Sequence, residues 1–310
     1  MMPRWLRRPL RKAVVYCFVW FSRRRGRRGL DAIRETGERF GDWHYRLRPF
    51  KRIRLQRQLA RALGYAPGDA AACRVLRAAY RNCDRAVFEV LALSAGAITA
   101  PQLAEQVEVS GLESLEQSLK SGEGAVLLGM HMGNSIALMI HLAVRGLPVS
   151  IVVHQSRKLS SGFFESMFDS VGLQTIQARP SVAAYYKMAR ALKKGRAVFV
   201  TMDQAGKQGG VSAWFLGKQV VMPVGPAALA RSVRVPVFPV LPLAETPTWK
   251  FRIGTPLHLS ESNSLEQDVA ELTGVMDTHI RAYPELWSWH HRRWSRDPFP
   301  EPGRDSQPTS

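Results

Sequence analysis

The chain has 310 residues, of which 45% are hydrophobic and 22% charged, so it is able to bury a sizeable core and is not a disordered protein. Its 44 Lys and Arg outnumber its 25 Asp and Glu, and the resulting net charge of +19 implies an anionic partner. Its three cysteines contain no CxxC pair, which excludes a disulfide scaffold and gives no zinc signature.

The positive charge is concentrated at the N-terminus. Residues 1–62 hold 19 Lys and Arg against four acids, a net charge of +15. An unbroken apolar run at residues 13–21 covers about half of a hydrocarbon core of ~30 Å, so it is too short to span a bilayer. Apolar residues recur there at helical spacing, with Trp5, Tyr16 and Trp20 as interfacial aromatics. We therefore predict that residues 1–29 form a basic amphipathic anchor in the plane of a membrane.

Two other interpretations of this segment stay open. The first is that residues 1–29 form a solvated basic arm, and the second is that they bind nucleic acid. The sequence contains no nucleic-acid-binding motif, and an apolar and aromatic stripe has no use on DNA. We therefore predict an anionic membrane surface as the partner, and no nucleic acid.

The next segment, residues 30–100, has the pattern of a helical lead-in region. Residues 30–65 are helical and basic, with a break at Pro49. A turn at residues 66–69 precedes a long helix at 70–93, and a short linker at 94–101 ends the region.

Residues 101–296 change to short apolar strands that alternate with helices. This alternation predicts an α/β domain whose mostly parallel central sheet is flanked by helices. A tail at 297–310, rich in Pro, Ser and charge, is predicted to be disordered. The predicted strands are 125–130, 149–154, 197–202, 235–241 and 249–253, and the predicted helices are 135–144, 181–194, 265–283 and a small-residue helix that opens after residues 222–225.

Two polar stretches follow predicted strands. Gly129-Met130-His131-Met132-Gly133-Asn134 places a histidine where one strand ends, and Met202-Asp203-Gln204-Ala205-Gly206 follows another. Ligands of open α/β sheets bind in the crevice at the carboxyl ends of the strands, so His131 is positioned as a general base. The alternatives are a structural histidine and a turn closed by the Asp203 side chain.

Two further stretches carry a possible function. Phe215-Leu216-Gly217-Lys218 precedes the Pro/Gly loop and small-residue helix at 222–231, for which tight packing is the simpler interpretation. Residues 284–294, PELWSWHHRRW, alternate aromatics with cations. That pattern is typical of a cation–π cap on the fold or of an anion-binding lip.

Taken in order, these stretches resemble the lipid A biosynthesis (lauroyl/myristoyl) acyltransferases, within the lysophospholipid acyltransferase superfamily. The resemblance rests on His-x-Gly-Asn, Asp-Gln, Phe-x-Gly, Pro-x-Gly-x-Ala-x-Leu-Ala-Arg and Pro-Glu-x-x-x-Trp-x-His-x-Arg-Trp, and it covers about residues 70–296. It implies a protein on the cytoplasmic face of the inner membrane, peripheral or monotopic. It further implies transfer of a fatty acyl chain from acyl carrier protein or acyl-CoA to a lipid or glycolipid acceptor, with no cofactor and no metal.

The chain departs from the family at one position. The family pattern is His-x4-Asp/Glu, in which the acid supports the histidine, but Ile136 stands where that acid is expected. Residues 124–164 contain no Asp or Glu at all. Three outcomes stay open: Asp203 serves as the acid, the acceptor is a more easily activated amine, or the protein is a catalytically silent, lipid-binding paralogue.

These considerations give a set of candidate site residues. We expect His131 to act as the general base and Asp203 as its acid, with backbone N–H groups of residues 133–135 stabilising the oxyanion. Cationic residues are candidates for binding a phosphate-bearing acceptor or a phosphopantetheine arm. The predicted substrate-binding residues are Asn134, Arg157, Lys158, Arg179, Gln204, His291 and Arg293.

Overall fold

A computed structural model describes most of the lead-in region and of the α/β domain. No helix among its described residues is long and apolar enough to cross a membrane. Most of the predicted anchor and all of the predicted tail lie outside the described residues, so both stay predictions. The described residues are 20, 21, 24, 25, 28–66, 68–153, 165–204, 209–244, 248–259 and 262–290.

The lead-in region is helical, as the sequence predicts. Pro49 ends the first helix and starts the second, because proline lacks the N–H that a helix interior needs but fits the first helical turn. Asp69 caps the long helix by accepting a hydrogen bond from the Ala71 N–H at 2.7 Å. The predicted linker contains the start of a further short helix. The four helices are α2 (Leu30–Leu47), α3 (Pro49–Leu63), α4 (Ala70–Ser94) and α5 (Ala100–Ala104).

A seven-stranded sheet forms the centre of the α/β domain, in the order β1-β9-β8-β2-β5-β3-β4. Every neighbouring pair is parallel except β8 and β9, so the predicted mostly parallel sheet is confirmed. The pattern missed β1 and β4, which are four-residue edge strands with polar residues. The strands are β1 (Val107–Ser110), β2 (Ala125–Gly129), β3 (Val149–Val153), β4 (Gln174–Gln177), β5 (Ala197–Thr201), β8 (Val237–Leu243) and β9 (Trp249–Ile253).

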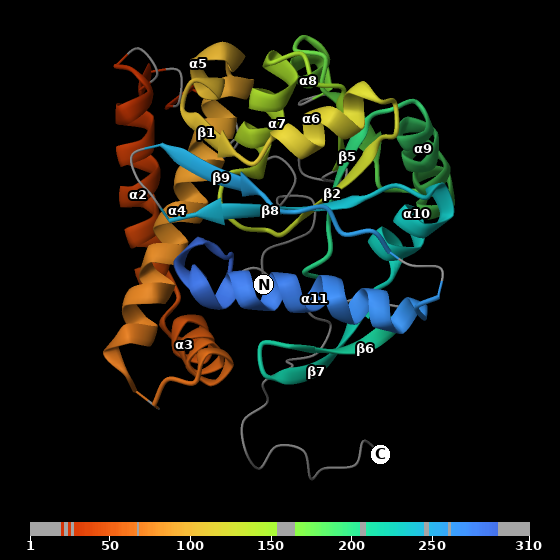
Figure 1. Ribbon diagram of the computed structural model, residues 1–310. Helices are drawn as coiled ribbons and strands as arrows, with labels where there is room; N and C mark the ends of the chain where they lie inside the picture. Colours follow the sequence, from red (N-terminus) through yellow and green to blue (C-terminus); the bar gives the residue numbers. More distant parts are fainter. Residues whose placement is uncertain are drawn as a thin grey trace.

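Helices cover both faces of the sheet (Figure 1). Helices α5, α6 (Glu113–Lys120), α7 (Ser135–Val144) and α8 (Glu165–Asp169) lie above it in that view. Below it lie α10 (Gly225–Val233) and α11 (Leu265–Ala282), and α9 (Ser181–Lys193) contacts α10. An antiparallel hairpin of β6 (Gly210–Phe215) and β7 (Lys218–Pro223), absent from the predicted elements, packs on α11.

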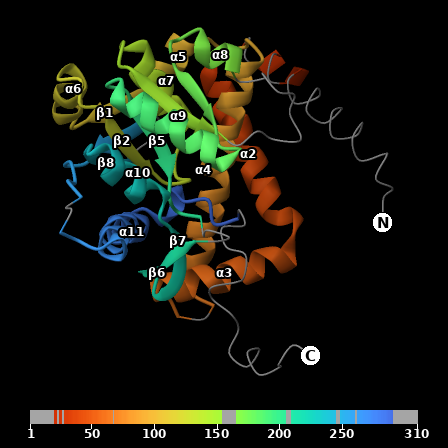
Figure 2. The same ribbon diagram turned by 90° about the vertical axis from the view of Figure 1, so that its right-hand side faces the viewer.

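Helices α2 and α4 lie side by side at the outer edge of the molecule (Figures 1 and 2). Two glycines allow this close approach. A Cβ on Gly37 would lie 2.7 Å from the Arg85 Cα, and one on Gly41 would lie 2.6 Å from the Arg81 Cα. Since the neighbouring atoms are backbone, neither glycine tolerates a side chain without moving one helix away from the other.

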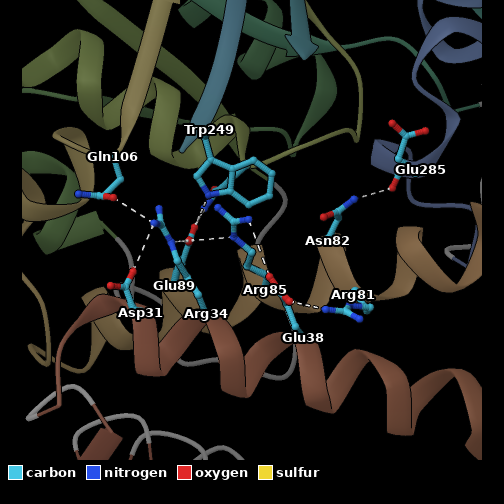
Figure 3. A network of polar contacts seen from close by, with 11 residues as sticks. Asp31, Arg34, Glu38, Arg81, Asn82, Arg85, Glu89, Gln106, Trp249 and Glu285 are labelled. Carbon is cyan, nitrogen blue, oxygen red and sulfur yellow. Dashed lines mark hydrogen bonds and ion pairs between the residues drawn. The ribbon is translucent and has the colours of Figure 1, made fainter. Parts of the chain in front are cut away.

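A buried carboxylate, Glu89, ties these helices to the sheet (Figure 3). Its Oε1 accepts a hydrogen bond from Arg34 Nε at 2.7 Å, and its Oε2 accepts from Trp249 Nε1 at 2.6 Å and from Asn134 Nδ2 at 2.7 Å. Arg85, only 3% exposed, lies over the Trp249 ring at 4.4 Å and approaches Glu89 at 3.5 Å. Glu89 itself has no exposed surface and is the nearest counter-charge of both guanidinium groups, since Asp31 and Glu38 approach Arg34 and Arg85 only to 3.9 Å.

We expect Glu89→Gln to lower the free energy of unfolding by about 3–5 kcal/mol, because it leaves Arg34 and Arg85 buried without their main counter-charge. Urea unfolding followed by circular dichroism measures this loss.

Glu35→Gln on α2 is the matched control. Glu35 and Arg39 form an ion pair of the same 2.7 Å length, but their side chains are 58% and 72% exposed. Exposed pairs of this kind contribute little, so the control should change the free energy of unfolding by less than about 1 kcal/mol. Equal losses in the two variants would show that the buried network does not hold the helices.

His279 is buried and His141 is half-buried, and each ring lies beside a backbone carbonyl. His279 lies beside the Pro242 carbonyl oxygen, 2.7 Å from its Nε2, and His141 lies beside the Ala104 carbonyl oxygen, 2.8 Å from its Nδ1. Burial lowers the pKa of both rings below the ordinary value of 6.5, although the carbonyl partners oppose part of that shift. The folded protein therefore takes up these protons at a lower pH than the unfolded chain does.

The free energy of unfolding should fall with acidification in a defined window. Because the pKa of each ring is lower in the folded state, the stability is complete above about pH 6.5 and is lost as the pH drops toward the folded-state pKa. Replacing His279 by Gln keeps a donor for the Pro242 carbonyl and removes the titration. Urea unfolding of this variant should show a weaker pH dependence below pH 6.5, and an unchanged dependence would contradict the assignment.

Candidate active site

The central strands β2 and β5 bring His131 and Asp203 together. The two strands are parallel neighbours, and their last residues, Gly129 and Thr201, are register partners. His131 follows β2 by two residues and Asp203 follows β5 by two residues, so both side chains emerge from the same edge of the sheet. This edge is the carboxyl end of the parallel strands, where ligands bind in open α/β sheets.

Asp203 binds His131 through both of its carboxylate oxygens. His131 Nδ1 lies 2.7 Å from Asp203 Oδ1, and the His131 backbone N–H donates to Oδ2 at 3.0 Å. Asp203 thus lies within hydrogen-bonding distance of the ring, as a supporting acid for His131 must. A neutral ring that donates Nδ1–H to Asp203 carries its lone pair on Nε2. The His131 side chain is 33% exposed while Asp203 is fully buried, so the carboxylate holds the ring from the protein side.

The segment after α11 closes over this pair. Trp287, 1% exposed, donates its Nε1–H to Asp203 Oδ2 at 2.8 Å. Ser288 donates its backbone N–H and its hydroxyl to the His131 carbonyl oxygen, at 3.1 and 2.9 Å. Phe215 of β6 meets the Trp287 ring edge-on, with centroids 6.1 Å apart. The widely separated Phe-x-Gly and Pro-Glu stretches thus meet behind the histidine.

Gly133 shapes the loop between β2 and α7. Its φ is +60°, a left-handed conformation that favours glycine, and a Cβ there would lie 3.0 Å from the Pro242 Cβ. Its N–H donates to the Leu286 carbonyl oxygen at 3.2 Å. That hydrogen bond corrects the expectation for this residue, because an N–H used inside the fold is not available to an oxyanion.

The Asn134 side chain is buried and forms its hydrogen bonds within the protein. Its Oδ1 caps α7 by accepting from the Ala137 N–H at 3.1 Å, and its Nδ2 donates to Glu89 at 2.7 Å. The side chain is 3% exposed, and both ends of its amide are used within the protein. These contacts indicate that Asn134 fixes the start of α7, in place of the substrate contact expected from the sequence.

The other predicted substrate-binding residues have different positions. Gln204 is exposed beside the histidine, with its Nε2 3.5 Å from His131 Nε2. Arg179 is exposed beyond the end of β4, three strands from β2 and thus roughly 14 Å across the sheet. Four residues lie outside the described part of the chain, so their roles stay predictions: Arg157, Lys158, His291 and Arg293.

Ile136 lies in the first turn of α7 and packs on the hydrophobic core. The missing acid of the His-x4-Asp/Glu pattern therefore leaves no gap beside His131, since Asp203 already occupies Nδ1. Sequence reasoning did not find Trp287 as the second donor to this carboxylate, nor Glu89 as the residue behind Asn134. One signal for Glu89 in the sequence is its i,i+4 spacing from Arg85 on a helix that is otherwise mostly apolar, and the stretch from Tyr80 to Glu89 also resembles the family's helical lead-in.

Known proteins resemble this chain over most of its length. The family model of the bacterial lipid A biosynthesis acyltransferases matches residues 4–296. A phosphatidylinositol mannoside acyltransferase of Mycolicibacterium smegmatis is 27% identical over 248 residues, which is 78% of this chain and 79% of that protein. A phosphatidylinositol mannoside acyltransferase of Mycobacterium tuberculosis is 26% identical over 256 residues, 78% of this chain and 77% of that protein. This chain therefore belongs to the bacterial lipid A biosynthesis acyltransferase family and is an acyltransferase.

Proposed function

We propose that the protein transfers a fatty acyl chain from an acyl thioester to a hydroxyl group of a lipid or glycolipid, with His131 as the general base. The observation that carries the proposal is the 2.7 Å contact between His131 Nδ1 and Asp203. A buried carboxylate in this position fixes the tautomer and orientation of the ring, and it stabilises the imidazolium that forms during the reaction.

This arrangement bears on the alternatives that the sequence left open. An amine acceptor is one alternative because Ile136 replaces the family acid, and an amine would need only a weaker base. With Asp203 in place the base is supported, and a hydroxyl acceptor needs no special explanation. The catalytically silent paralogue also loses its main argument, since that hypothesis rested on the missing acid.

The proposed step is a direct transfer. The acceptor hydroxyl oxygen attacks the thioester carbonyl while His131 Nε2 accepts the hydroxyl proton, and the thiol leaves as the ester forms. The positive charge on the ring is balanced by Asp203. Of the three N–H groups predicted to bind the oxyanion, those of Asn134 and Ser135 are retained as candidates at the start of α7.

The relatives suggest the class of acceptor. Both are phosphatidylinositol mannoside acyltransferases, so we propose a glycolipid whose sugar hydroxyl accepts the acyl chain. Exposed cations at the strand ends, such as Arg179, suit a phosphate on that acceptor or on the donor's phosphopantetheine arm. We further propose that the acyl chain is carried by acyl carrier protein or by coenzyme A. The protein is proposed to act on the cytoplasmic face of an inner membrane.

Replacing either member of the pair should reduce acyl transfer. His131→Ala removes the base and should lower kcat/KM by about 10²–10⁴. Asp203→Asn keeps the shape but disturbs the ring's tautomer, and should lower kcat by up to about 10⁴. The measurement is ester formation by the purified full chain from an acyl thioester and a glycolipid, followed by mass spectrometry.

Asp268→Asn is the matched control for Asp203→Asn. Asp268 of α11 is equally buried, but it binds Arg231 of α10 at 2.6 Å and has no role in the proposed step. This variant should lose stability yet keep its turnover per folded molecule. If His131→Ala transfers acyl chains at the wild-type rate, the proposed base is wrong.

Ile136→Glu tests whether the family acid still has a place here. A glutamate at position 136 would restore the family pattern His-x4-Glu. Because Asp203 already occupies Nδ1, we expect no gain in acyl transfer, and a loss of stability from placing a charge on a half-buried core position. A clear gain in the rate of transfer to hydroxyl acceptors would show that Asp203 is a poor substitute for the acid.

A further inference from the structure

Large apolar side chains are exposed where α2 ends and α3 begins. Phe50 is 88% exposed, Trp43 53%, Leu47 52% and Ile53 42%. Single exposed apolar residues are common on soluble proteins, but these four lie within eleven consecutive residues at one turn of the chain. We call residues 43–61 the α2–α3 elbow.

The elbow is also strongly basic. It holds seven Lys and Arg and no acid, and residues 43–68 contain no Asp or Glu. The nearest acid before it, Asp42, forms a 2.6 Å ion pair with Arg77 on α4. Burial is the main cause that lowers the pKa of Lys51, and the neighbouring charges of Arg48 and Arg54 lower it further. The seven cations are Arg46, Arg48, Lys51, Arg52, Arg54, Arg57 and Arg61.

Because of the helical spacing, the exposed apolar and basic residues of α3 lie on the side of the helix that faces away from the protein. Along α3 the exposed positions are 49, 50, 53, 54, 57 and 61, which recur at four-residue spacing in the two rows 49-53-57-61 and 50-54, while Leu55 and Leu59 are buried on the opposite side. The outer face thus has aromatic and aliphatic side chains at its N-terminal end, with arginines beside and behind them. Figure 2 shows α2 descending along the outside of the molecule and α3 turning back beneath it, so the elbow forms a corner.

The elbow lies close to the chain segment that covers the proposed site. Lys51 Nζ donates to the His290 carbonyl oxygen at 2.7 Å. Two residues earlier, Ser288 binds the His131 carbonyl oxygen. Tyr80 of α4 stacks on the His290 ring, with centroids 4.4 Å apart, and fixes this segment against the helices. Lys51 of the elbow is therefore joined, through residues 288–290, to the loop that carries His131.

We propose that the α2–α3 elbow is a docking surface for an anionic lipid bilayer, in addition to the anchor predicted at residues 1–29. A bilayer accepts both features of the elbow at once, since its phosphates meet the arginines while Phe50 and Trp43 enter the headgroup and acyl boundary. The purpose of this docking rests on the proposed lipid acceptor. The binding itself does not, and it is measured without acyl transfer.

The test measures binding of the full chain to phosphatidylcholine vesicles with and without phosphatidylglycerol, by flotation and without any acyl donor. Free energies of the anchor and the elbow add, so an elbow variant changes the partition constant even when the anchor remains. Phe50→Ser should lower that constant about tenfold on phosphatidylglycerol vesicles. Arg54→Gln should lower it about fivefold there and leave the weaker binding to pure phosphatidylcholine unchanged.

Trp214→Ser is the matched control, because Trp214 is 67% exposed on the β6–β7 hairpin, outside the elbow. It should bind like the wild type. The proposal is overturned if Phe50→Ser partitions like the wild type, or if Trp214→Ser loses as much. It is equally overturned if both elbow variants bind vesicles normally but lose affinity for acidic acyl carrier protein, which would make the elbow a protein-docking surface. None of these outcomes depends on whether the protein turns over a thioester.

Discussion

The hydrogen bonds between Asp203 and His131 join two neighbouring parallel strands at the edge of the sheet where the proposed chemistry takes place. One carboxylate accepts from the ring, from the His131 backbone and from Trp287, so it joins the segment after β5 to the loop after β2 and to the segment after α11. Removing such a group leaves several buried donors without a partner, and the cost is larger than that of one hydrogen bond. The orientation of the histidine therefore depends on the fold as a whole and not on its neighbours in the sequence.

Glu89 has the corresponding position on the other side of the loop. It links Arg34 of α2, Asn134 at the start of α7 and Trp249 of β9. The loop that carries His131 is thus held at both ends, by Asp203 and Trp287 on one side and by Asn134 and Glu89 on the other. The glycine contacts between α2 and α4 make this possible, because they bring Arg34 near a carboxylate on the neighbouring helix. The helical lead-in region is in this way part of the support of the proposed site.

Much of this arrangement was predictable from the sequence, for identifiable reasons. Continuous apolar runs indicated β2 and β5, and the residue after each run then had to emerge at the same edge of a parallel sheet. That reasoning placed Asp203 near His131 without a family acid at Ile136. Short polar edge strands such as β1 and β4 carry no such signal, and the β6–β7 hairpin has no Asn-Gly or Asp-Gly turn to reveal it. Trp287 and Glu89 were missed because their partners lie 84 and 45 residues away in the chain, and nothing local records such contacts.

The central claim is that Asp203, in place of the acid expected at Ile136, orients His131. The most direct measurement is the tautomer of the His131 ring, determined from its ¹⁵N chemical shifts in histidine-labelled full chain, with His131→Ala to assign the signal. We predict a neutral ring with its proton on Nδ1, and a shift away from that tautomer in Asp203→Asn. A ring protonated on Nε2 in the wild type, or a signal that Asp203→Asn leaves unchanged, would contradict the account.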